Sequence, residues 1–79
     1  MKILLTWTME AWGPTGKMAV EQLTECLSIE DLDDSKAVNE TLEKRRQEVS
    51  ELIKNKVTSK ARGGCSNTVL FHSPVTILP

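Results

Sequence analysis

The sequence predicts a mainly α-helical protein, a two-helix hairpin with weakly ordered ends. Residues 35–60 contain no Gly or Pro and repeat apolar residues at the spacing of one helix face. Residues 17–27 show the same spacing over about three turns. The flanking stretches, 1–16 and 63–79, carry few charges or none and show no clear period. We therefore expect one helical hairpin or short coiled-coil segment over 17–62, between two weakly ordered ends.

Residues 1–16 are expected to form a flexible or extended lead. Their only charges are Lys2 and Glu10, and they finish in a Gly-Pro-Thr-Gly cluster that is typical of a turn. A short strand over residues 2–8 is the alternative for this stretch.

The short helix is expected over residues 17–27 because the apolar residues of this segment gather on one face. Lys17, Glu21 and Glu25 point elsewhere on the same helical wheel. At about 1.5 Å per residue this helix is roughly 16 Å long, which is marginal for a helix without tertiary contacts. Its apolar face consists of Ala19, Val20, Leu23, Cys26 and Leu27.

The long helix is expected over residues 35–60. The apolar period breaks just before it, at Asp33, Asp34 and Ser35, whose short oxygen-bearing side chains cap helix N-termini. Basic residues crowd the last turns, where the helix dipole favours positive charge, and a Gly-Gly pair at 63–64 supplies a stop. This helix is about 38 Å long, so the short helix covers less than half of its apolar face.

Residues 63–79 contain no Asp, Glu, Lys or Arg, and we expect them to form a weakly ordered tail. The run 68–71 has β propensity, but the residues at 72–74 include a proline and interrupt it. The alternative is a two-stranded ribbon that pairs this run with residues 2–8. Such a ribbon is rarely stable by itself.

No arrangement of residues for catalysis is recognisable, so we expect no enzymatic activity, no cofactor and no metal site. His72 is the only histidine, and Cys65 lies near it in a Gly/Ser-rich tail with no scaffold to fix the pair. Cys26 and Cys65 are widely spaced, which matches neither a zinc site nor a CxxC redox motif.

The same features predict a cytoplasmic or nuclear protein with reduced cysteines. The apolar run at 3–5 is shorter than the hydrophobic region of a signal peptide, and polar residues follow it. No stretch approaches the ~20 apolar residues of a membrane span. Secretion and membrane insertion are therefore not expected.

The apolar stripe of the long helix carries the predicted function, a non-catalytic protein–protein interaction. Large aliphatic side chains recur along it at mixed spacings of three, four and seven residues, with one arginine among them. The entropy cost of ordering the hairpin exceeds the expected gain from burying its two stripes, so we expect a partner, either another helical protein or a second copy. The predicted partner-binding residues are Val38, Leu42, Arg45, Val49, Leu52, Ile53 and Val57.

Two alternatives remain open. In the first alternative, the basic end of the long helix contacts nucleic acid or an acidic surface. Its bases are Lys54, Lys56, Lys60 and Arg62. A net charge of −1 and the lack of aromatics among these bases argue against nucleic acid as the partner. In the second, the composition changes around 17–62 mark a truncated or alternatively spliced fragment without independent function.

Overall fold

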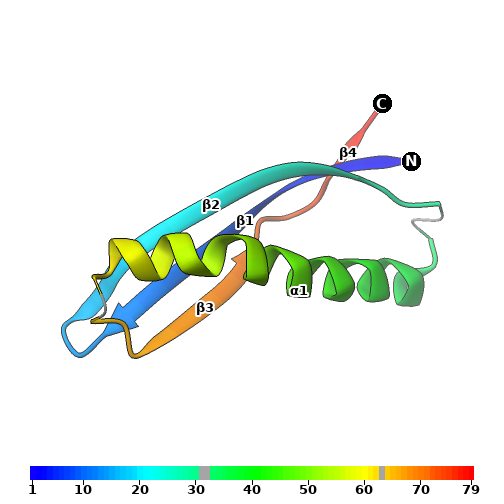
Figure 1. The fold of residues 1–79 in the computed structure, drawn as a ribbon. Coiled ribbons are helices and arrows are strands. Elements are labelled where there is room, and N and C mark those ends of the chain that lie inside the picture. The colour runs from blue at the N-terminus through cyan, green and yellow to red at the C-terminus, as the bar shows by residue number, and fades with distance from the viewer. Residues whose placement is uncertain (31–32, 63) are drawn as a thin grey trace.

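Strands make up most of the regular structure of the protein. The computed structural model describes residues 1–30, 33–62 and 64–79. In these residues four antiparallel strands form a sheet, and a helix lies across one of its faces (Figure 1). The elements in chain order are β1 (Lys2–Gly13), β2 (Gly16–Ser28), α1 (Ser35–Lys60), β3 (Asn67–His72) and β4 (Thr76–Leu78).

The predicted two-helix hairpin is therefore wrong. The segment 17–27, expected to be a helix, belongs to β2, and the ends that were expected to be weakly ordered contain β1, β3 and β4. The molecule is a small β-sheet protein with a helix, neither mainly α-helical nor a coiled coil. The long helix itself is confirmed, with the bounds Ser35–Lys60. Gly63, part of the expected stop signal, lies outside the described residues.

β1 is the central strand, and the other strands all pair with it in antiparallel orientation. β2 runs along one side of β1 over its whole length. On the other side, β3 pairs with residues 7–12 and β4 pairs with residues 2–4. The outer edges of the sheet are thus β2 on one side and β3 with β4 on the other.

The core forms because β1 alternates strictly between its two faces. Ile3, Leu5, Trp7, Met9 and Ala11 point toward the helix, and none of them is more than 2% exposed. The residues between them are mostly polar and lie on the face that the helix leaves uncovered. This period of two is the pattern of a half-buried strand.

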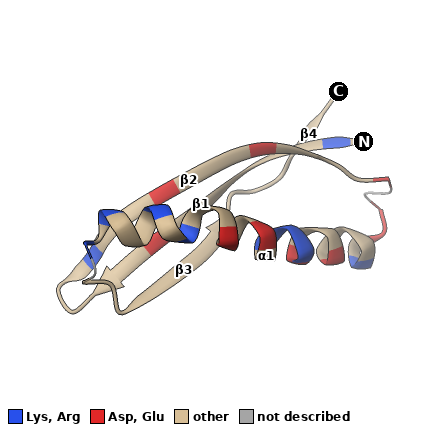
Figure 2. Cartoon of the chain, in the orientation of Figure 1, with Lys and Arg blue, Asp and Glu red and all other residues tan. Residues whose placement is uncertain are grey.

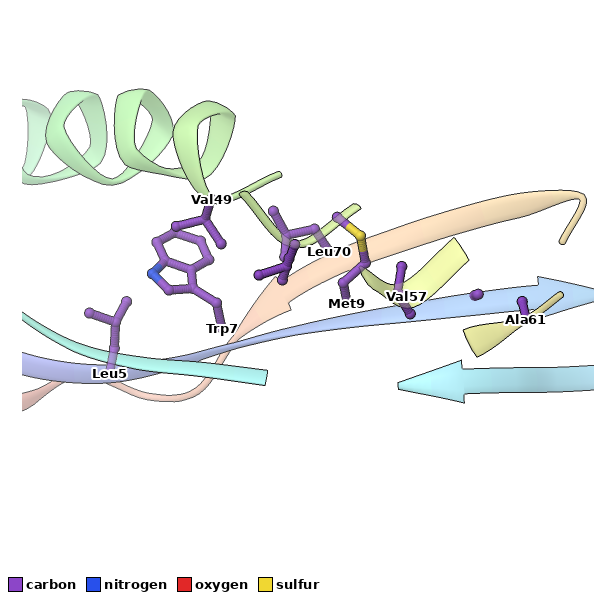
Figure 3. Close-up of a cluster of buried hydrophobic side chains, with 9 residues drawn as sticks. Leu5, Trp7, Met9, Val49, Val57, Ala61 and Leu70 are labelled. Atoms are coloured by element: carbon purple, nitrogen blue, oxygen red, sulfur yellow. The ribbon is translucent and has the colours of Figure 1, made fainter. Parts of the chain in front are cut away.

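The helix covers the apolar face of β1 with one stripe of its own. Val49, Ile53 and Val57 are buried there among the side chains of β1 and β3 (Figure 3). At the start of α1 the Asp34 carboxylate accepts a hydrogen bond from the Ala37 N–H at 3.1 Å, which is the cap expected from the sequence.

A tight turn at residues 14–15 joins β1 to β2, as the Gly-Pro-Thr-Gly cluster predicts. Gly16 follows it with a φ of 118°, a backbone conformation that residues with a Cβ rarely adopt. The turn directs β2 back along β1 and so sets the register of the hairpin.

Strand β2 resembles a helix in sequence because two glutamates occupy its inner face. Cross-strand partners share a face, and Glu21 and Glu25 lie opposite the inward-pointing Met9 and Leu5. The two acids interrupt the alternation of Ala19, Leu23 and Leu27, which pack against the core. The remaining apolar positions then fit a 3.6-residue period by coincidence.

Candidate functional site

The structure distributes the seven predicted partner-binding residues over several environments. Three are buried against the sheet and are not accessible to another protein. Two are half-buried, one forms ion pairs, and Leu52 is 57% exposed. The buried residues are Val49, Ile53 and Val57, and the half-buried ones are Val38 and Leu42. Arg45 is the residue that forms ion pairs, and Leu52 is the exposed one.

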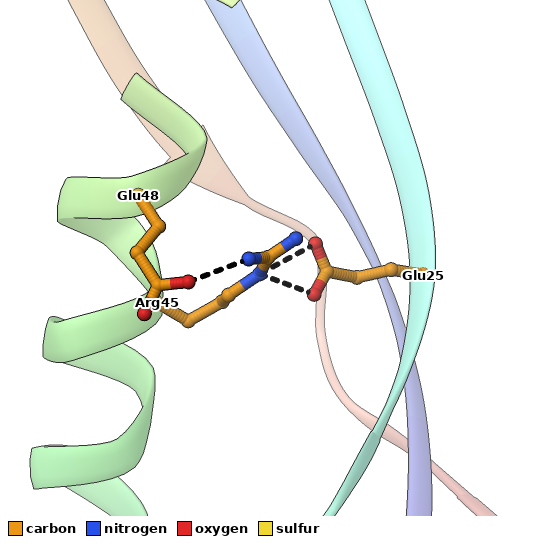
Figure 4. A network of polar contacts seen from close by, with 3 residues as sticks. All are labelled: Glu25, Arg45 and Glu48. Atoms are coloured by element: carbon orange, nitrogen blue, oxygen red, sulfur yellow. Dashed lines mark hydrogen bonds and ion pairs between the residues drawn. The ribbon is translucent and has the colours of Figure 1, made fainter. Parts of the chain in front are cut away.

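Arg45 links the helix to strand β2. Its Nε lies 2.7 Å from Oε1 of Glu25, and its Nη1 lies 2.8 Å from Oε2 of Glu48 (Figure 4). The hydrogen bond to Glu25 raises the pKa of the guanidinium above its ordinary value, and the bond to Glu48 acts in the same direction, although burial opposes both. The positive charge on the predicted stripe is therefore matched within the chain.

The basic helix end is also partly neutralised. Lys60 pairs with Glu21 of β2 at 2.5 Å, and its Nζ lies 3.4 Å from the carbonyl of Val20. The hydrogen bond from Lys60 lowers the pKa of Glu21, against the opposing effect of burial. Lys54 points to the other side of the helix, where it lines a pocket beside β3.

Pockets lie in a row between α1 and β3. The first, about 220 Å³, is bounded by Trp7, His72 and the helix at residues 39–46. The second, about 170 Å³, shares Arg46 with the first. The third, about 280 Å³, shares Thr68 with the second and extends to Lys54. Because neighbouring pockets share lining residues, we treat them as one feature, the α1–β3 groove.

The outer edge of β3 presents backbone groups beside this groove. The Ser73 N–H donates to the Thr6 carbonyl at 2.9 Å, so these two residues form a hydrogen-bonded pair next to the β1–β3 ladder. Such pairs alternate with pairs whose backbone groups point away from the partner strand. Thr68, Leu70 and His72 therefore direct their N–H and C=O groups outward, and their side chains line the groove.

The two edges of the sheet differ in charge. On β2, Glu21 and Glu25 form ion pairs with the helix, and Lys17 pairs with Glu10. Strand β3 contains no Asp, Glu, Lys or Arg, and neither does β4 (Figure 2). Charged side chains protect sheet edges against pairing with other chains. The β3 edge lacks this protection.

Apolar side chains are also exposed on the face of the sheet opposite the helix. Val69 and Phe71 of β3 are 43% and 44% exposed there. They lie beside Glu10 and Thr8 of β1 in the register of the sheet. A strand added to β3 would extend this face and cover part of both side chains.

Trp7, which lines the first pocket, has an unpaired polar atom. The residue is fully buried, yet its indole Nε1 has no hydrogen-bond partner among the described residues. In Figure 3 the indole nitrogen points along β1 toward Leu5, away from Met9 and Val57. A buried N–H without an acceptor costs about 1–3 kcal/mol, so this indole lowers the stability that the core gains from Trp7.

Two features were searched for in the part of the chain that the structure describes, a metal-binding cluster and a membrane-spanning helix. No group of three His, Cys, Asp or Glu side chains is placed to hold a metal ion among the residues outside 31–32 and 63. Over the same residues, no helix has the length and apolar character needed to cross a membrane. The chain matches no protein-family model, no curated protein and no solved structure.

Sequence reasoning missed the α1–β3 groove, although two signals for it are present. The first is the period of two from residue 3 to residue 11, which marks β1 as a strand. The second is the uncharged stretch from 67 to 78, in which the run 68–71 has β propensity. The sequence suggests pairing of these two ends only as a two-stranded ribbon, which is rarely stable by itself, whereas in the structure β2 adds a further strand.

Proposed function

We propose that the protein is a non-catalytic protein-interaction module that binds an extended segment of another protein by strand addition to β3. In this mode the partner segment continues the sheet, and its side chains enter the α1–β3 groove. The observation that carries the proposal is the coincidence of outward-directed backbone groups at Thr68, Leu70 and His72 with pockets lined by the same residues.

The division of roles follows from the geometry. Backbone hydrogen bonds to the three outward-directed residues would provide affinity that does not depend on the partner's sequence. Alternate side chains of the added strand would point into the groove, since successive side chains of a strand face opposite ways. The others would pack on Val69 and Phe71 on the open face. Selectivity then resides in the pockets.

Charge favours a foreign segment over a second copy. Arg46 and Lys54 line the groove, and neither forms an ion pair with a described residue. A partner strand with an acidic side chain would neutralise one of them. The β3 strand of a second copy has no acid to offer, since residues 63–79 contain no Asp or Glu.

The test is selection of random ten-residue peptides displayed on phage against the full chain, followed by measurement of Kd for synthetic peptides. The variant Thr68→Pro removes an outward N–H of β3 without removing a bond to β1. We expect it to weaken binding by roughly tenfold or more. The matched control is Cys26→Pro, which removes an outward N–H from the β2 edge, and we expect it to leave the Kd unchanged.

Two results would contradict the proposal. Peptide binding that survives Thr68→Pro and is lost in Cys26→Pro would place the interface on β2. A chain that selects no peptides and sediments as a dimer dissociated by Thr68→Pro would make the second copy the occupant. Thermal melts of both variants establish that each is folded before binding is measured.

The compartment belongs to the same proposal. Cys26 and Cys65 are both free thiols in the structure, Cys26 exposed and Cys65 half-buried. Free thiols persist in reducing compartments, so we propose that the interaction takes place in the cytoplasm or the nucleus. Mass spectrometry of alkylated protein from cells tests this, and a disulfide between Cys26 or Cys65 and a partner would oppose it.

A further inference from the structure

The helix side of the α1–β3 groove carries charges in a fixed order. Lys54 lines the third pocket and is the only charged residue among the described residues around it. Arg46 lines both the second and the first pocket, and Glu43 lines the first. All three side chains are exposed, and none of them forms an ion pair with a described residue. The groove therefore presents two unpaired cations and, at one end, an unpaired anion.

The strand side of the groove does not balance these charges, because β3 contains no Asp, Glu, Lys or Arg (Figure 2). Thr68 lines the third and second pockets, Leu70 lines the second, and His72 lines the first. Residues opposite each other on paired strands share a face of the sheet. A strand added to β3 would therefore place one side chain opposite each of these three residues, beside one charged part of the helix after another.

We propose that the segment bound at β3 has acidic side chains at the two alternate positions opposite Thr68 and Leu70, and an uncharged side chain opposite His72. The first acid pairs with Lys54 and the second pairs with Arg46. This inference rests on the proposed strand addition, because a paired strand presents every second side chain to the groove.

The spacing of the two bases fits this pattern. Eight residues of α1 separate Arg46 from Lys54, which corresponds to about 12 Å along the helix axis. Side chains on one face of a strand follow each other at about 7 Å, and the flexible stems of the bases make up the difference. An acid at the third position would meet Glu43 as well as Arg46, so attraction and repulsion would oppose each other there. The third position therefore favours an uncharged residue.

The first test is the composition of the ten-residue peptides that the full chain selects. We expect Asp or Glu at two positions separated by one residue. Replacing either acid by its amide should raise the Kd roughly two- to fivefold, the range of an exposed ion pair. Added NaCl should raise the Kd of the acidic peptide more than that of the peptide with both amides, because salt screens exposed charges.

The second test is an exchange of charge between chain and peptide. Lys54→Glu should weaken the acidic peptide and restore binding of one of its two single acid-to-lysine versions. Arg46→Glu should restore binding of the other version, so the two variants also report the direction of the bound segment. Lys44→Glu is the matched control, since Lys44 is exposed on α1 and lines none of the three pockets. It should leave the ranking of the peptides unchanged. A variant that merely unfolds cannot produce restored binding.

The outcomes distinguish this inference from the proposed function. Peptides that are lost in Thr68→Pro, lack the two acids and bind Lys54→Glu as tightly as the unaltered chain overturn the charge pattern alone. Acidic peptides that follow the charges at 46 and 54 but bind Thr68→Pro unchanged overturn the strand addition, because the groove then binds acids without pairing to β3. A chain that selects no peptide overturns both.

Discussion

Arg45, in the middle of the helix, donates through one Nε–H to both carboxylate oxygens of Glu25 on strand β2, at 2.7 and 3.1 Å. The two side chains are 27% and 13% exposed, so water competes only partly for this contact. Together with Lys60 and Glu21, the pair ties α1 to the β2 side of the sheet. No equivalent tie to β3 occurs among the described residues, which is why the groove lies on that side.

We expect the Arg45–Glu25 pair to be energetically coupled. Glu25→Leu alone leaves the guanidinium half-buried with Glu48 as its remaining partner, and so destabilises the fold. Arg45→Leu together with Glu25→Leu should cost less than the sum of the two single changes. A double-mutant cycle by urea unfolding should give a coupling of about 0.5–3 kcal/mol. Additive effects would mean that the pair does not hold the helix to β2.

Acid should weaken the fold through Glu21. Its pKa in the folded state lies below the ordinary value of 4.5 because Lys60 hydrogen-bonds to the carboxylate. The stabilisation is therefore present above that value and is lost as the pH falls through the folded-state pKa. The measurement is the free energy of unfolding in urea between about pH 3 and pH 6. Lys60→Met should make this free energy depend less on pH over that range. Lys54→Met, which removes an unpaired lysine, should leave this pH dependence unchanged.

Neighbouring residues of the helix should differ sharply in their contribution to stability. Ile53 is buried against the sheet and Leu52 is 57% exposed. Ile53→Ala should lower the free energy of unfolding by about 2–5 kcal/mol, because it removes core contacts and leaves a cavity. Leu52→Ala should change it by no more than about 0.5 kcal/mol. Equal losses in a thermal or urea melt would contradict the packing of α1 described above.

The helix should depend on its N-terminal cap. Asp34→Ala removes the acceptor of the Ala37 N–H, and we expect it to lower the free energy of unfolding by about 0.5–2 kcal/mol. Asp34→Asn should retain most of this stability, because its side-chain oxygen accepts the same bond. Lys36→Ala, a change at an exposed neighbouring position, serves as the control. A cap variant that melts like the control would mean that the helix begins elsewhere.

The sequence predicted the helix well because helix signals are local. The cap at Asp34 and the uninterrupted run to Lys60 involve residues close to one another in the chain. The strands were harder to predict because their partners are far away. Thr6 and Ser73 bond to each other across most of the sequence, and no local pattern announces that contact.

The candidate site was missed for a related reason. Val49, Ile53 and Val57 belong to the apolar stripe that was predicted to bind another chain, but in the structure they pack against β1 and Leu70 of the same chain. The α1–β3 groove arises from what the helix leaves uncovered, which depends on ion pairs such as Arg45–Glu25. The sequence shows acids at positions 21 and 25, but not that they lie on a strand and pair with the helix.

Because β1 pairs with every other strand of the described residues, the sheet must assemble around residues 2–13. The nascent chain can close the hairpin with β2 and form α1 early, since both steps join residues that are close in sequence. The second side of β1 is covered by residues 67–78, which lie on the far side of the helix in the chain. Contacts of such long sequence separation slow folding. Until these contacts form, the half-built sheet exposes a second open edge, and a chaperone that shields β1 would shorten its exposure to aggregation.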